Sequence, residues 1–299
     1  MSLQTGRSWC DPWPAPAKLN LFLHVIGRRP DGYHLLQTVF RAIDLEDTLR
    51  FAPRDDGEVR LASPLAGVPQ EADLTVRAAK LLQRATGCKA GATIAVEKRI
   101  PVGGGLGGGS SDAATTLIAL NRLWETGVPR ADLMRLGVEL GADVPFFLFG
   151  RSAFAEGIGE LLTAIDLAPS WYLILAPQVS VSTQKIFSDP GLTRDTKPIK
   201  IATFFAGFAG NDLESVVCEK YPQVARALEC LGAQGLDARM SGSGASVFAA
   251  FASEREARSV AAGIPEDVRA AVASFVVRGL DRHPLDFDEP VQVGSRQVG

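Results

Sequence analysis

Residues 101–111 read Pro101-Val102-Gly103-Gly104-Gly105-Leu106-Gly107-Gly108-Gly109-Ser110-Ser111, and six of the seven positions from 103 to 109 are glycine. Because glycine has no Cβ, several backbone N–H groups of such a stretch can converge on phosphate oxygens. The hydroxyls of Ser110 and Ser111 stand where a helix is expected to begin, so they can cap it, bind a phosphate or help to hold a magnesium ion. The stretch therefore predicts a nucleotide phosphate-binding loop.

The segments around this glycine loop support that interpretation. Residues 93–96 are typical of a strand, and apolar residues at helical spacing predict a helix over 113–124, followed by a second helix over 131–140. A flexible glycine linker would lack such ordered flanks. The predicted order is strand, glycine loop, helix.

Three classes of phosphate-binding loop compete for this stretch. A Walker loop needs a lysine after its last glycine, where Ser110 stands, so that class is excluded. Gly103, Gly105 and Gly108 satisfy G-x-G-x-x-G, which keeps a dinucleotide-binding unit open. A dinucleotide-binding unit would next have a second parallel strand that ends in an acidic residue. Residues 131–140 are instead predicted to be helical, which argues against this class. The upstream segments also predict a β-meander.

The remaining periodicities predict an α+β chain of two domains. Alternation over 18–25 predicts a strand that carries Lys18, Asn20, Phe22 and His24 on one face and Leu19, Leu21, Leu23 and Val25 on the other. Further strands are expected over 38–43, 48–51, 171–176, 247–251 and 275–278, and further helices over 74–85 and 254–262. A polar break at 166–170 divides the chain into a domain of residues 9–166 and one of 167–285. The polar residues 286–299 are expected to form a disordered tail.

Composition narrows the functional classes. The 299 residues carry a net charge of -3, which lacks the basic footprint of a general nucleic-acid-binding protein. No apolar run reaches the ~18 residues that would span a bilayer, and residues 1–16 lack the layout of a signal peptide. The four scattered cysteines read as reduced thiols. We therefore expect a cytoplasmic protein with neither nucleic acid nor membrane as a partner.

Four spaced motifs resemble one known superfamily. They are Pro16–Leu21 with Asp31–His34, the glycine loop, Gly141–Phe147 and Met240–Ala245. Over roughly residues 14–280 the chain is similar to the galactokinase, homoserine kinase, mevalonate kinase and phosphomevalonate kinase (GHMP) superfamily. The resemblance implies a two-domain fold, with an N-terminal β-rich α+β domain and a C-terminal ferredoxin-like α+β domain. It also implies an active site in the cleft between the two.

Within this superfamily, the motifs resemble the branch that phosphorylates a cytidine diphosphate-linked methylerythritol. That resemblance implies transfer of a phosphoryl group from ATP, with Mg²⁺, to the 2-hydroxyl of this small molecule, on the non-mevalonate route to isoprenoid precursors. Residues 101–111 would bind ATP, and Asp143 would be the catalytic base, steered by Lys18. Without the resemblance, Asp143 would be an ordinary turn residue and Lys18 a surface charge.

The resemblance implies a substrate site as well. Asn20 would contact the substrate, and Tyr33 and His34 would hold the cytosine by stacking and hydrogen bonding. The motif around Thr183 supplies Phe187 for the other side of the base, although phenylalanine is more often a core residue. Asp73 stands where an asparagine would be expected near the adenine. His24 and His283 are expected to be structural. The motifs name no carboxylate for the metal, so we expect phosphates and water to hold it, with Ser111 as the protein ligand.

Three other interpretations stay open at this point. The chain could be another kinase of the superfamily, although sugars, homoserine and mevalonate carry no base for Tyr33 and His34 to stack on. It could be a nicotinamide-dependent oxidoreductase that uses Gly103, Gly105 and Gly108. It could also be a non-catalytic nucleotide sensor, which would not need Lys18 and Asp143 together. For its assembly, we expect a monomer or a weak homodimer.

Overall fold

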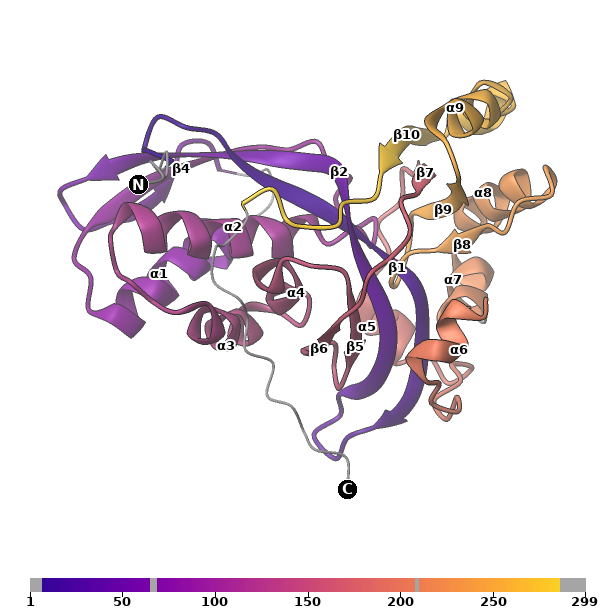
Figure 1. Ribbon diagram of the computed structural model, residues 1–299, viewed down its shortest axis with the longest axis horizontal. Helices are drawn as coiled ribbons and strands as arrows, with labels where there is room; N and C mark the ends of the chain where they lie inside the picture. The colour runs from indigo at the N-terminus through magenta and orange to yellow at the C-terminus, as the bar shows by residue number, and fades with distance from the viewer. Residues whose placement is uncertain (1–6, 65–68, 208–209, 286–299) are drawn as a thin grey trace.

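A long antiparallel hairpin runs through the middle of the molecule (Figure 1). The structure is a computed structural model that describes residues 7–64, 69–207 and 210–285. Strands β1 (Trp13–Arg28) and β2 (His34–Arg54) form the hairpin and are joined by a short turn. The predicted strands 38–43 and 48–51 are both part of β2. A register irregularity opposite Pro16 and Ala17 falls between them and accounts for the break in the alternation.

Six strands of the described chain form the N-terminal sheet. Beside β1 and β2 these are β3 (Val59–Leu61), β4 (Gly91–Glu97), β5 (Ala153–Glu156) and β6 (Leu161–Ala164). The strand order is β3-β4-β2-β5-β6, with β1 paired to β2. The prediction of a strand over 93–96 is confirmed by β4. The short strands β5 and β6 were not predicted.

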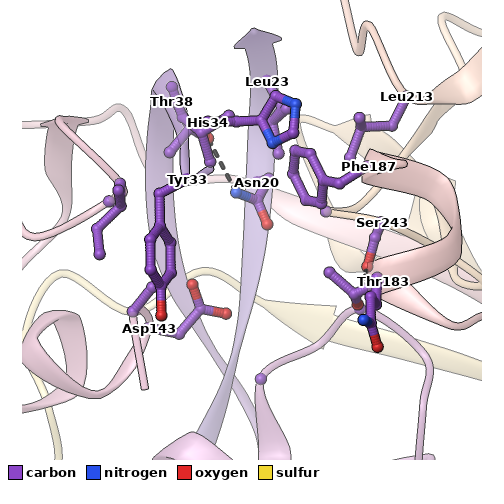
Figure 2. Close-up of a pocket in the computed structure, with 18 of the residues that line it drawn as sticks. Asn20, Leu23, Tyr33, His34, Thr38, Asp143, Thr183, Phe187, Leu213 and Ser243 are labelled. Carbon is purple, nitrogen blue, oxygen red and sulfur yellow. Dashed lines mark hydrogen bonds between the residues drawn. The ribbon is translucent and has the colours of Figure 1, made fainter. Parts of the chain in front are cut away.

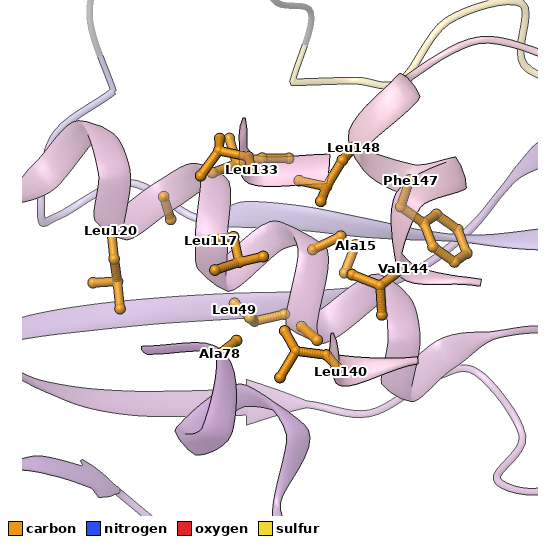
Figure 3. Packing of buried hydrophobic residues seen from close by; sticks show 14 of the residues in the cluster. Ala15, Leu49, Ala78, Leu117, Leu120, Leu133, Leu140, Val144, Phe147 and Leu148 are labelled. Carbon is orange, nitrogen blue, oxygen red and sulfur yellow. The ribbon is translucent and has the colours of Figure 1, made fainter. Parts of the chain in front are cut away.

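Helices cover one face of this sheet (Figures 1 and 3). They are α1 (Leu74–Thr86), α2 (Gly108–Leu123), α3 (Arg130–Leu140) and α4 (Val144–Phe149), after a 3₁₀ turn at Gln70–Ala72. Their buried side chains, such as Leu117, Leu133 and Leu148, pack with Leu49 of β2 in one core. The expected helix over 113–124 exists, but it begins at Gly108, inside the glycine loop. The short helix α4 was not predicted.

The second half of the chain builds its own sheet. Strands β7 (Trp171–Pro177), β8 (Arg239–Met240), β9 (Val247–Phe251) and β10 (Val272–Arg278) are antiparallel in the order β10-β7-β9-β8. This is the order 4-1-3-2 of a ferredoxin-like sheet, as the resemblance implied. The predicted helix over 254–262 is α9 (Glu254–Ala262). Five helices were not predicted: α5 (Thr183–Phe187), α6 (Ile201–Phe205), α7 (Glu214–Lys220), α8 (Pro222–Gly232) and α10 (Glu266–Arg269).

Arg41 of β2 marks the junction between the two sheets. Its side chain is buried, its Nη1 donates to the carbonyl of Ala168 at 2.6 Å, and its guanidinium lies 6.0 Å from the ring centre of Tyr172 in β7. After β10 the chain returns to the first half, where Gly279 bridges to Ile43. We keep the domain boundary between residues 166 and 167 as a proposal. Residues 279–285 belong to the predicted second domain, but they pack against the N-terminal half. Residues 286–299, where a disordered tail was expected, lie outside the described part of the chain.

A β-bulge in β1 changes which side chains share a face. The register to β2 shifts between Asn20, which pairs with Phe40, and Leu23, which pairs with Thr38. The strict alternation predicted for 18–25 is therefore wrong beyond Asn20. The extra residue turns Leu23 to the side of Lys18 and Asn20, and all three line the same cavity.

Candidate active site

Two cavities lie on either side of the glycine loop. The larger, of about 750 Å³, is lined by residues of β1, β2, α5 and the loop at 242–244, and the smaller, of about 350 Å³, by residues around α1 and the end of β4. Gly103, Gly105, Gly107 and Ser110 line both. The predicted ATP-binding stretch is thus the wall that the two cavities share.

Glycine is required in this loop by its backbone conformation. Gly103, Gly105 and Gly107 have φ of +72°, +74° and +73°, which side chains of L-residues rarely allow. A Cβ on Gly105 would lie 2.8 Å from the carbonyl oxygen of Gly244 and closer still to that of Ser241. Only glycine therefore allows the close approach of these two segments.

The second glycine-rich segment, residues 241–244, supports the first. Ser246 N donates to Gly104 O at 3.0 Å, and Ser241 Oγ donates to Gly105 O at 3.2 Å. On the other side, Lys18 N donates to Leu106 O at 2.9 Å, and the Leu106 side chain is buried. The loop is therefore fixed from both halves of the chain through three of its carbonyl oxygens, and these contacts use none of its N–H groups.

The first turn of α2 follows this loop. Gly107 is its N-cap, so the positive end of the helix dipole lies at the wall between the cavities. Ser110 lines both cavities, whereas Ser111 is fully buried and its Oγ has no hydrogen-bond partner among the described residues. Of the two serines, Ser110 is the one placed to touch a bound phosphate.

Lys18 and Asp143 meet in the larger cavity. Lys18 Nζ lies 3.4 Å from Asp143 Oδ2, and it also donates to Asn20 Oδ1. Asn20 Nδ2 in turn donates to Thr38 Oγ1 at 2.9 Å. Asp143 immediately precedes α4, and its side chain is about one-third exposed, so it faces the cavity. The sequence pattern gave no signal for Thr38, whose role becomes visible only through the pairing of β1 with β2.

An aromatic group forms another part of the same cavity (Figure 2). The rings of His34 and Phe187 lie 4.9 Å apart at 32° to one another, and Tyr33 is 59% exposed at the cavity wall. Thr183 Oγ1 is 2.7 Å from Ser243 Oγ. The five predicted substrate-binding residues are therefore brought to one cavity, although Asn20 and Phe187 are far apart in the sequence.

A charged cluster that the motifs did not reveal borders the smaller cavity. Lys98 Nζ donates to the buried Asp47 and, at 2.7 Å, to Asp112 Oδ2. Asp47 Oδ1 also accepts from the backbone N–H groups of Arg99, at 2.5 Å, and Ile100, at 2.8 Å. The pKa of Asp112 is raised to about 7, mainly by burial; the Lys98 ammonium opposes this shift and the nearby Asp47 carboxylate adds to it. The cluster joins the end of β4 to the start of α2.

Asp73 also borders the smaller cavity. Its Oδ1 accepts from Thr75 N at 2.8 Å and from Thr75 Oγ1 at 2.5 Å, so Asp73 caps the N-terminus of α1. The histidines expected to be structural, His24 and His283, are buried and are not among the residues that line either cavity. Burial lowers the pKa of His283 to about 3, and Leu285 N donates to its Nδ1.

The described residues contain neither a metal-binding cluster nor a membrane-spanning helix. No group of three His, Cys, Asp or Glu side chains is arranged to hold a metal ion within residues 7–64, 69–207 and 210–285. Over the same ranges, no helix has both the length and the apolar character needed to cross a membrane.

Comparison with known proteins assigns the family. The model for the GHMP kinases N terminal domain matches residues 73–151, and the model for GHMP kinases C terminal matches residues 194–270. The chain is 59% identical over 273 residues to a 4-diphosphocytidyl-2-C-methyl-D-erythritol kinase of Dechloromonas aromatica, covering 91% of this chain and 98% of that one. It is 62% identical over 281 residues to the protein of the same name from Nitrosospira multiformis, covering 92% and 94%.

Solved structures agree with this assignment. A crystal structure of 4-(cytidine 5'-diphospho)-2C-methyl-D-erythritol kinase superposes with a TM-score of 0.76 at 35% identity, over 90% of this chain and 99% of that chain. Homoserine kinase from Cytophaga hutchinsonii, with a TM-score of 0.70 at 18% identity over 95% and 98%, shares the fold. The two-domain α+β fold implied by the motifs is confirmed. The chain belongs to the 4-diphosphocytidyl-2-C-methyl-D-erythritol kinase family of the GHMP kinases.

Proposed function

We propose that this protein transfers the γ-phosphoryl group of ATP to the 2-hydroxyl of 4-diphosphocytidyl-2-C-methyl-D-erythritol, on the non-mevalonate route to isoprenoid precursors. The observation that carries the proposal is the Lys18–Asp143 pair at 3.4 Å. This pair shares one cavity with the glycine loop and with the aromatic group of Tyr33, His34 and Phe187. A phosphate cradle, a base with its cation and a stacking site are the parts that such a transfer needs.

The proposed reaction assigns a task to each charged group. The Asp143 carboxylate accepts the proton of the substrate hydroxyl as the hydroxyl oxygen bonds to the γ-phosphorus. The bond between that phosphorus and the oxygen bridging it to the β-phosphate breaks, and ADP leaves. Lys18 orients Asp143 and offsets the negative charge that develops on the transferred group. Asn20 holds Lys18 from the other side and faces the same cavity.

ATP is proposed to bind across the glycine loop. Its phosphates would lie on the backbone N–H groups of residues 101–111 and at the positive end of α2. Mg²⁺ would be held by phosphate oxygens and water. The serine that would add a hydroxyl is Ser110, which lines both cavities, and not Ser111 as expected, because Ser111 is buried. When bound, Mg²⁺ would neutralise charge on the phosphates. The adenine would occupy the smaller cavity, beside Asp73.

The aromatic group favours a substrate that carries a base. Tyr33, His34 and Phe187 all line the larger cavity, and sugars, homoserine and mevalonate have no aromatic ring to stack on them. Thr183 lies on the same side through its contact with Ser243. We further propose that the enzyme works in the cytoplasm as a monomer or weak homodimer, with neither nucleic acid nor membrane as partner. The net charge of -3 and the lack of long apolar runs support this.

One assay tests the proposed function against its rivals. ADP release is measured with the cytidine diphosphate-linked substrate, mevalonate and homoserine, and NAD(P)H oxidation is followed in parallel. We expect ADP release with the cytidine substrate alone. In Asp143→Asn, ATP binding should persist while turnover falls about 100-fold or more, because the base and its charge are lost.

Each other outcome would point elsewhere. ADP release with mevalonate or homoserine would show that the protein is a kinase for that substrate. Oxidation of the nicotinamide would favour a dinucleotide-dependent oxidoreductase. ATP binding without any turnover would favour a nucleotide sensor. Near-normal turnover of Asp143→Asn would show that Asp143 is not the catalytic base.

A further inference from the structure

Arg194 lies in the segment after α5 and contacts both sides of the aromatic group. Its Nη2 donates to Phe187 O at 3.0 Å and to Asp189 O at 2.5 Å, and its Nη1 donates to Leu192 O at 3.0 Å. Its Nε donates to His34 Nε2 at 3.2 Å, although His34 is 160 residues away in β2. One guanidinium therefore closes the turn that carries Phe187 and links it to His34.

The contact with Arg194 determines the protonation of His34. A guanidinium has N–H donors and no acceptor, so the nitrogen that it contacts must offer a lone pair. His34 Nε2 is that nitrogen, and a neutral imidazole then carries its proton on Nδ1. We infer that Arg194 is a positioning and specificity-determining residue, which fixes His34 as the Nδ1–H tautomer so that it donates a hydrogen bond to the pyrimidine of the substrate.

The charges around His34 act in the same direction. Burial lowers the pKa of His34, and the neighbouring cations Arg194 and Arg28 lower it further. The carboxylate of Asp31 lines the same cavity, but it forms an ion pair with Arg29 at 2.7 Å. The imidazole therefore stays neutral near pH 7, and its tautomer is the property that Arg194 controls.

A donor at Nδ1 has consequences for base recognition. Cytosine offers acceptors at N3 and O2, whereas uracil carries a proton on N3. An Nδ1–H group directed at N3 would favour cytosine, and the Nε2–H tautomer would present a lone pair there instead. The inference rests on the proposed function, since it concerns the site that would hold the cytosine.

The tautomer can be observed directly. The chain has three histidines, so long-range ¹H–¹⁵N spectra of the ¹⁵N-labelled protein contain three imidazoles, and a His34→Gln variant assigns one of them. At pH 7 we expect His34 to show a protonated Nδ1 and an unprotonated Nε2. A His34 protonated on Nε2, or on both nitrogens, would overturn the inference without any variant of Arg194.

Kinetics of Arg194→Met add a second readout. In this variant His34 lacks the contact with Arg194, so its neutral imidazole populates both tautomers. The KM for the cytidine substrate should therefore rise several-fold at pH 7.5, with little change in kcat. As the pH falls, protonation of His34 places a proton on Nδ1 again, so this KM penalty should shrink with falling pH. A KM penalty that does not change with pH would mean that Arg194 only holds the turn.

The matched control is Lys220→Met. Lys220 lies 2.6 Å from Asp189 Oδ2 and ties the same turn to α7 without contacting His34. We expect this variant to leave the imidazole spectrum and the pH dependence of KM unchanged, and a change equal to that of Arg194→Met would refute the inference. If the wild type does not turn over the cytidine substrate while His34 has the expected tautomer, the proposed function fails and the tautomer assignment stands.

Discussion

At the residue scale, Lys18 is held on several sides within the larger cavity. Its Nζ donates to Asn20 Oδ1, forms an ion pair with Asp143 and lies 5.5 Å from the centre of the Phe40 ring. Such an ammonium has little freedom left, so its charge is already in place before a phosphoryl group arrives.

Tyr33→Ala tests the stacking role. The Tyr33 side chain is 59% exposed, so its loss should leave the free energy of unfolding almost unchanged. If Tyr33 stacks on the base, the KM for the cytidine substrate should rise roughly 5- to 150-fold, from the ~1–3 kcal/mol of base–aromatic stacking. Steady-state kinetics measure this, with Phe205→Ala as control, because Phe205 is similarly exposed and is not among the cavity-lining residues. An unchanged KM would exclude the contact.

Asp112→Asn tests the buried charge at the smaller cavity. The pKa of Asp112 is about 7 in the folded protein and near 3.8 in the unfolded chain, so the folded state binds the extra proton between these values. Wild-type stability from this group is therefore present below about pH 4 and is lost as the pH rises to about 7. Asparagine does not titrate.

The free energy of unfolding is measured by urea titration for Asp112→Asn and for the wild type. The difference, variant minus wild type, should increase from pH 5 to pH 7.5 and level off above. Taking this difference removes the opposite contribution of the histidines, whose pKa values are lowered by burial. A difference independent of pH would show that Asp112 is already ionised in the folded protein at pH 5.

At the element scale, the glycine loop works because two segments from different halves of the chain pack backbone to backbone. Ser241 and Ser246 supply the hydrogen bonds, and Gly105 leaves room for them. The loop is thereby rigid enough to present its N–H groups and the start of α2 in one place.

Gly105→Ala should damage this element severely. The added Cβ would meet the carbonyl of Gly244 and require a φ of +74° from alanine, which together cost at least about 2 kcal/mol of unfolding free energy. ATP affinity should fall as well, measured by calorimetry. Gly109→Ala is the control inside the same motif. Its Cβ would find only Leu74 Cδ1 at 3.4 Å, and alanine in a helix should stabilise by about 0.5–1 kcal/mol. Equal stability of the two variants would contradict this account.

At the scale of the whole molecule, the two sheets are connected by a buried arginine. Arg41 of β2 packs against Gly279, where a Cβ would lie 2.6 Å from Arg41 Cζ. The same arginine reaches Ala168 before β7 and Asp281 after β10, the latter at 3.5 Å. This junction sets how the Phe187 side of the cavity faces the Asp143 side.

Gly279→Ala should therefore destabilise the whole protein. Displacing Arg41 breaks its bond to Ala168 O and overpacks the junction, which should cost about 1–3 kcal/mol in urea unfolding. Gly232→Ala, at the end of α8 with nothing within 4 Å of the added Cβ, should change stability by less than about 1 kcal/mol. Identical midpoints for the two variants would show that Arg41 can move freely.

The sequence by itself determined the local features of this protein. The spacing of apolar residues over 74–85, 247–251 and 254–262 predicted elements with nearly the observed bounds. This spacing is visible in the sequence because each element buries one face. The glycines of 103–109 indicated a phosphate loop, and three of them, Gly103, Gly105 and Gly107, have a positive φ that favours glycine. The spaced motifs then indicated the GHMP fold.

Only the tertiary structure decided how these parts meet. The bulge that turns Leu23 into the cavity depends on pairing with β2, and the charge cluster of Asp47, Lys98 and Asp112 joins three segments. The bond from Arg194 to His34 spans 160 residues. Such contacts leave no period or motif in the chain, because a side chain's partner across a fold is set by how the elements pack together and not by its own neighbours in sequence.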